Sequence, residues 1–189
     1  YEWAFEHCQL IIGGNWDYGV GCRTFPRDHY YWDQLGPERL RCLRELPQET
    51  EFWFSGRRFR LFHGRPVMPE LYTVADDREL LQSFLVDAKG VPYDGLLYAD
   101  AHRQAMRTLS PGIIVNTGSV GNAMGVPKCC YALLEGEEGR IPAPLEVRLR
   151  QLDYDREQAV RDAEAADGLP IKEAYIREIQ TGIYSRSHG

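Results

Sequence analysis

Two short apolar runs, each followed at once by polar residues, constrain the fold of this chain more than any other feature. Residues 95–99 lead into Asp100 and His102, and residues 113–115 lead into the polar segment 116–121. Apolar runs of this length that are bounded by turn residues are typical of buried strands. In open α/β sheets the ligand site lies outside the strand ends. The pattern therefore predicts an α/β fold with polar side chains gathered at one edge of a sheet.

Asp100 and His102 are the first candidate pair for a site. They lie two residues apart, and on extended backbone residues i and i+2 point to the same side. We therefore expect both side chains to face one metal or phosphate site.

The chain has the size and composition of one globular domain. It holds 189 residues, of which 43% are hydrophobic and 26% charged, so we expect a single domain over residues 1–189. The net charge of -6 disfavours nonspecific nucleic-acid binding. No apolar run approaches the roughly 20 residues of a membrane helix, and the first residues lack a signal-peptide pattern, so we expect a cytoplasmic location and no membrane partner. The five cysteines contain no Cys-x-x-Cys pair, which predicts reduced thiols.

The remaining pattern predicts strands and helices in mixed order. Residues 9–12 predict a buried strand close to the start of the chain, followed by a loop that holds residues 15–17. Apolar spacing and proline positions predict helices over residues 37–46, 76–88, 155–166 and 171–180. Further strands are expected over residues 51–54, 57–62, 128–135 and 145–149, the first two joined as a hairpin. Because the last of these alternates apolar and charged residues, the sheet is expected to be mixed.

Four polar motifs follow the predicted strands, and their order is informative. They are Gly14-Asn15-Trp16-Asp17, His63-Gly64-Arg65-Pro66, Ala99-Asp100-Ala101-His102 and Asn116-Thr117-Gly118-Ser119-Val120-Gly121. In this order the motifs resemble the later motifs of calcineurin-like metallophosphoesterases, especially the small bacterial and archaeal phosphodiesterase branch. The resemblance covers nearly the whole chain and includes the tail over residues 152–170.

The resemblance implies a fold and a chemistry. The implied fold is α/β, a metallophosphoesterase-like sandwich of two facing mixed β-sheets flanked by helices and lacking its first βα units. The implied chemistry is hydrolysis of a phosphomonoester or phosphodiester by a hydroxide bound to divalent metal ions. The implied partner is a phosphoester small molecule or a nucleotide.

Site residues are carried over from the resemblance position by position. Asn15 and His63 would bind the second metal, Asp100 would add another ligand to it, and His102 would bind the first metal. Imidazole and carboxylate ligands suit manganese, iron or zinc, of which manganese or iron is preferred here. Residues expected to support the site through backbone geometry and hydrogen bonds are Asn116, Gly118 and Ser119.

Three departures from the family pattern count against catalysis. The opening Asp-x-His and Gly-Asp motifs have no counterpart in the sequence, which leaves the first metal nearly without ligands. Trp16 occupies the position of the family's catalytic histidine, and indole cannot transfer a proton. Asp100 replaces the first histidine of a Gly-His-x-His motif, which keeps a ligand but adds negative charge.

Several alternatives stay open at this level. A single histidine near a strand end, such as His63, is more often structural than a metal ligand, and Asn15 after two glycines is a common turn residue. The main functional rival is a degenerate phosphoesterase-fold module with a binding or regulatory role. An unrelated small-molecule-binding α/β domain would leave the order of the motifs to chance. A rearranged chain, in which residues 96–102 form the family's opening strand, is disfavoured because residues 116–121 follow at the spacing of the later motif.

Overall fold

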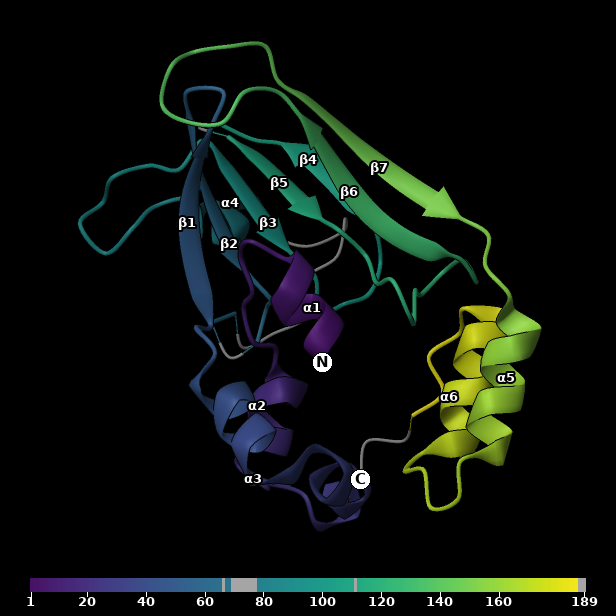
Figure 1. Ribbon diagram of the computed structural model, residues 1–189. Coiled ribbons are helices and arrows are strands. Elements are labelled where there is room, and N and C mark those ends of the chain that lie inside the picture. The colour runs from purple at the N-terminus through teal and green to yellow at the C-terminus, as the bar shows by residue number, and fades with distance from the viewer. Residues whose placement is uncertain (66, 69–77, 111, 187–189) are drawn as a thin grey trace.

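The computed structural model describes residues 1–65, 67–68, 78–110 and 112–186 (Figure 1). The helices are α1 (Glu2–His7), α2 (Asn15–Gly21), the 3-10 helix η1 (Pro26–Asp28), α3 (His29–Glu45), α4 (Arg78–Ser83), α5 (Arg156–Ala165) and α6 (Lys172–Thr181). The strands are β1 (Glu49–Phe54), β2 (Arg57–Phe62), β3 (Gly95–Tyr98), β4 (Ala105–Thr108), β5 (Ile113–Asn116), β6 (Cys129–Glu135) and β7 (Glu146–Leu152). Among the helices described, none is long and apolar enough to cross a membrane.

The main sheet has five strands in the order β1-β2-β3-β5-β4. The three central strands run parallel, and the edge strands β1 and β4 run antiparallel to their neighbours. The prediction of a mixed sheet is therefore confirmed. All four residues of β3 are buried, as expected for a parallel strand covered on both faces.

Successive side chains of the strands point to opposite faces of the main sheet, and a hydrophobic core lies on each face. On one face Phe59, Leu97 and Val115 pack against apolar residues of β6 and β7, which form a second sheet of two antiparallel strands. On the other face Leu96 and Ile114 join a cluster that includes Leu81 of α4. The α/β sandwich is thus confirmed, but the second sheet is antiparallel in the described residues, not mixed as predicted.

Helices α2, α3, α5 and α6 lie beyond the ends of the sheets, whereas α4 packs on a face of the main sheet (Figure 1). Helices α2 and α3 pack together at one end, and α5 and α6 form a separate pair that follows β7 (Figure 1). The α2–α3 contact is close at Gly21, where a Cβ atom would lie 2.6 Å from the backbone nitrogen of Arg44. A larger side chain at this position would force the two helices apart.

The N-terminal region differs most from the prediction. Residues 9–12 form no strand, because no other strand of the described chain pairs with them. The expected loop 15–17 is instead the first turn of α2, and the expected early strand is preceded by α1. A side chain explains the start of α2: the Asp17 carboxylate accepts a hydrogen bond from the Gly14 backbone N–H at 2.8 Å, which caps the helix.

Two predicted helices have different bounds, and one strand was not predicted. The helix expected at 37–46 is the second part of α3, which starts at His29 and kinks at Gly36 with φ of 72°. The helix expected at 76–88 ends at Ser83. Further along the chain, the Asp87 carboxylate accepts hydrogen bonds from the backbone N–H groups of Lys89 and Val91 in a turn. Residues 76–77 lie outside the described residues. Strand β4 escaped prediction because its residues, Ala-Met-Arg-Thr, do not form an apolar run like those of β3 and β5.

Candidate functional site

His63 and Asp100 meet at the carboxyl ends of two parallel strands. His63 follows β2 directly, and Asp100 comes two residues after β3, its neighbour in the sheet. The Ala99 backbone N–H donates to the His63 carbonyl oxygen at 2.7 Å. His63 Nε2 then lies 3.5 Å from Asp100 Oδ1. Two of the four predicted metal ligands are therefore neighbours.

Arg65 is a third member of this cluster and was missed by the sequence analysis. Its Nε donates to Asp100 Oδ2 at 3.0 Å, its Nη2 to Oδ1 at 3.3 Å, and its backbone N–H to Oδ2 at 3.4 Å. The chain can approach so closely because Gly64, with φ of +144°, has no Cβ; such an atom would lie 2.4 Å from Asp100 Cβ. The only sequence signal for a role of Arg65 was its position close to His63 in the second motif.

The partners of Asp100 keep its carboxyl group ionised. Burial by itself would raise the pKa of Asp100, but hydrogen bonds from His63 and Arg65 outweigh burial and lower the pKa below its usual value. Both carboxylate oxygens accept hydrogen bonds from Arg65. Asp100 is therefore a buried anion that fixes the orientation of an arginine.

The backbone conformation at His102 differs from the extended one that the sequence predicted. Asp100 and His102 have φ of 40° and 54°, so the premise that both lie on extended backbone is wrong. His102 Nδ1 lies 2.8 Å from the carbonyl oxygen of Asn122. Because a carbonyl only accepts, Nδ1 carries the proton and Nε2 keeps its lone pair.

The pKa of His102 gives the protein an expected pH dependence. Burial lowers this pKa more than the hydrogen bond to the Asn122 carbonyl raises it, and the nearby positive charge of Arg186 lowers it further. The unfolded chain takes up a proton at His102 as the pH falls through about 6.5, whereas the folded chain does so only at lower pH. Stability from this residue is therefore present above about pH 6.5 and is lost as the pH falls below it.

We expect the free energy of unfolding to decrease between pH 7 and pH 5 more steeply in the wild type than in His102→Gln. Glutamine keeps a hydrogen-bond donor for the Asn122 carbonyl but has no proton to bind. Urea unfolding at several pH values measures both slopes. Parallel slopes in the two proteins would show that His102 does not titrate differently on folding.

Asn15 and Trp16 stand beside the cluster at the start of α2. A Cβ atom on Gly14 would lie 2.9 Å from Cγ of His63, so the His63 ring rests on the backbone directly before Asn15. Asn15 and Arg65 line the same cavity. Trp16 meets Tyr31 edge to face, with ring centroids 5.8 Å apart, and carries the guanidinium of Arg186 over its ring at 5.2 Å.

Asn116, Gly118 and Ser119 hold the loops behind the cluster. The buried Asn116 side chain donates to the Ala99 carbonyl oxygen at 2.7 Å and accepts from the Gly118 N–H at 3.0 Å. Gly118 has φ of +81°, which favours glycine. Ser119 Oγ accepts from the backbone N–H of Asn122 at 3.1 Å. These bonds tie residues 99–102 to residues 116–122.

The donor set does not fit the predicted two-metal centre. In the part of the chain that the structure describes, no three His, Cys, Asp or Glu side chains gather in a way that could hold a metal ion. His63 and Asp100 are adjacent, but Asp100 already accepts from Arg65 through both oxygens. Metal binding by Asn15, His63, Asp100 and His102 stays a prediction.

Comparison with solved structures defines the fold. No protein-family model and no curated protein matches the sequence. The hypothetical protein PH1004 from Pyrococcus horikoshii OT3 aligns over 97% of this chain and 77% of its own, with a TM-score of 0.68 and 18% identity. A metallophosphoesterase from Sphaerobacter thermophilus aligns over 96% of this chain and 80% of its own, with a TM-score of 0.65 and 17% identity. The chain therefore has the calcineurin-like metallophosphoesterase fold.

Proposed function

We propose that this chain binds phosphoester compounds, with Arg65 as the main contact to the phosphoryl oxygens. The observation that carries the proposal is the way Arg65 is held. Asp100 is buried and orients the guanidinium, while the Arg65 side chain stays 42% exposed and lines a cavity. A guanidinium fixed in this way presents its remaining N–H groups to a ligand with little loss of side-chain entropy, and its planar shape matches phosphate.

Calorimetric titration of metal-free protein with phenyl phosphate tests this function. The wild type is expected to bind saturably, and Arg65→Gln to bind about tenfold more weakly or worse, because a hydrogen bond to a charged group contributes about 1.5–3 kcal/mol. Arg161→Gln on α5 is the matched control and should bind like the wild type. Unchanged affinity in Arg65→Gln, or no saturable binding by the wild type, would reject phosphoester binding at this site.

Metal-dependent hydrolysis of a phosphomonoester or phosphodiester is the second candidate. It is favoured by the 3.5 Å separation of His63 Nε2 and Asp100 Oδ1. His63 and Asp100 would be the side chains that hold a metal ion there, and such an ion would supply an activated hydroxide. The free Nε2 of His102 is also the form that a metal ligand requires. Manganese or iron, and less readily zinc, would suit these donors. The cytoplasmic location of the protein also stays a prediction.

The same protein distinguishes the two candidates. After loading with manganese, a hydrolase is expected to turn over bis-para-nitrophenyl phosphate and to lose that activity in His63→Ala. Elemental analysis of the loaded wild type and His63→Ala reports metal content independently of turnover. Phosphoester binding without turnover or bound metal would assign the chain to binding alone.

A further inference from the structure

A cavity of about 660 Å³ adjoins Arg65. It lies between α2, the turn that holds Phe25, the helix α6 and residues 184–186. Arg65 lines this cavity while contacting Asp100, so the cavity opens directly beside the His63–Asp100–Arg65 cluster. Its size is that of a typical site for a small organic ligand.

Arginines outnumber acidic residues in the lining of the cavity. Four guanidinium groups line it, from Arg27, Arg65, Arg177 and Arg186, against the two carboxylates of Asp28 and Glu173. Two of the arginines are held in place by buried carboxylates: Arg65 by Asp100, and Arg186 by Glu178 with Nε 3.0 Å from Oε2.

Arg177 is the cation most available to a ligand. Within the described residues, the Arg177 guanidinium makes neither a hydrogen bond nor an ion pair. Arg27 already has partners: its Nε lies 3.9 Å from Asp28 Oδ1, and its guanidinium lies over the Phe25 ring at 5.4 Å. An anionic group in the cavity would give the Arg177 guanidinium a partner.

Aromatic rings form the rest of the lining. Trp16, Phe25 and Tyr184 are 37%, 50% and 52% exposed, and all three line the cavity. Large apolar side chains gathered around one hollow mark a ligand site more often than scattered ones do. Rings beside guanidinium groups suit a ligand with both a planar aromatic part and a negative charge.

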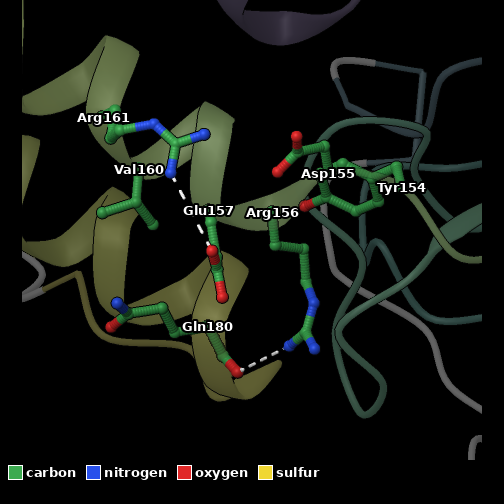
Figure 2. A pocket seen from close by; sticks show the side chains of 7 residues that line it. All are labelled: Tyr154, Asp155, Arg156, Glu157, Val160, Arg161 and Gln180. Atoms are coloured by element: carbon green, nitrogen blue, oxygen red, sulfur yellow. Dashed lines mark hydrogen bonds and ion pairs between the residues drawn. The ribbon is translucent and has the colours of Figure 1, made fainter.

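A second cavity, at the α5–α6 pair, offers a contrast (Figure 2). Its arginines are turned toward partners within the chain: Arg156 donates to the Gln180 carbonyl oxygen at 3.3 Å, and Arg161 lies 3.9 Å from Glu157. Arg161 therefore supplies a matched surface arginine for comparison with Arg177.

We propose that the cavity binds a mononucleotide, with its base stacked against Trp16 and Phe25 and its phosphate held by Arg65 and Arg177. The inference rests on the proposed phosphoester-binding function and adds the class of ligand. A small nucleotide fits better than a nucleic-acid strand, because the chain carries a net charge of -6 and the arginines line a single hollow.

Calorimetry on metal-free protein with adenosine 5′-monophosphate, ribose 5-phosphate and inorganic phosphate separates the two parts of the ligand. The wild type is expected to bind the nucleotide about tenfold more tightly than ribose 5-phosphate, because stacking of one base on an aromatic side chain contributes on this scale. Trp16→Leu is expected to lose that preference and keep its affinity for ribose 5-phosphate. Phe25→Leu serves in the same way if Trp16→Leu fails to fold, and Arg177→Gln should weaken both phosphorylated ligands.

Matched controls and outcomes make the test decisive. Trp3→Leu replaces an exposed tryptophan of α1, and Arg161→Gln an arginine of the other cavity; both should bind like the wild type. Equal affinity of the wild type for nucleotide and ribose 5-phosphate would overturn the inference but leave phosphoester binding intact. Tighter binding of a single-stranded oligonucleotide than of the mononucleotide would also overturn it. Failure to bind any of the three ligands would overturn the proposed function as well.

Discussion

Glu178→Ala is expected to lower the free energy of unfolding by about 3 kcal/mol, near the lower end of the cost of breaking a buried ion pair. Glu178 is fully buried on α6, and its carboxylate accepts hydrogen bonds from Arg186 Nε, Asn122 Nδ2 and the Ser185 backbone N–H, at 3.0, 2.8 and 3.0 Å. Removal leaves three donors without a partner. The loss falls toward the lower end because the Arg186 side chain is 21% exposed and can turn to water.

This residue also connects the C-terminal segment to the site. Asn122 supplies the carbonyl that accepts from His102, and Arg186 lies over Trp16. The Glu178→Ala variant should therefore weaken mononucleotide binding as well as stability. Urea unfolding measures the first effect and calorimetry the second.

The exposed Glu173→Ala on the same helix is the stability control, and its unfolding free energy is expected to stay within about 0.5 kcal/mol of the wild type. Glu178→Gln, which keeps the size and some hydrogen bonds, should fall between the two. A Glu178→Ala protein as stable as Glu173→Ala would show that the buried contacts contribute nothing net to folding.

Phe59→Ala is expected to cost about 3–5 kcal/mol of unfolding free energy, the usual loss for a buried phenylalanine in a core. Phe59 is fully buried in the core between the two sheets and stacks on Phe52 with ring centroids 5.3 Å apart. It also contacts Gly95 of β3, where a Cβ atom would lie 2.3 Å from Phe59 Cε1. Alanine would leave a cavity that these neighbours cannot fill without moving the strands.

Denaturant unfolding followed by circular dichroism measures this loss. Ile141→Ala is the control, because Ile141 is 79% exposed and its truncation should change stability by no more than about 0.5 kcal/mol. Equal midpoints for the two variants would contradict a packed core between the main sheet and β6–β7.

The sequence predicted those parts of the fold in which local pattern and tertiary packing agree. The hairpin of β1 and β2, the buried strands β3 and β5, and the C-terminal helices α5 and α6 lie close to their expected positions. Residues 9–12 have an equally apolar pattern but form no strand in the described chain. A strand needs a hydrogen-bonded neighbour, and local sequence does not reveal whether one is present.

The site was predicted through the strand ends but not in its details. His63 and Asp100 meet because β2 and β3 are parallel neighbours. The sequence predicted only that polar side chains gather at one edge of a sheet. The left-handed backbone of Asp100 and His102 carries only a weak local signal, since Asp and His are enriched in that region but most of them adopt other conformations. The ion pair of Arg65 with Asp100 joins residues that lie far apart in the sequence, and that of Arg186 with Glu178 joins a helix to the segment after it. Patterns in a single sequence do not report such contacts.

A crystal of the metal-free protein soaked in tungstate, a phosphate analogue with strong anomalous scattering, tests the arrangement at Arg65 most directly. The anomalous map is expected to show the anion within hydrogen-bond distance of the Arg65 guanidinium, with His63 and Asp100 in contact behind it. An anion bound elsewhere with none at Arg65, or His63 and Asp100 found apart, would contradict a phosphoester site at this edge of the sheet.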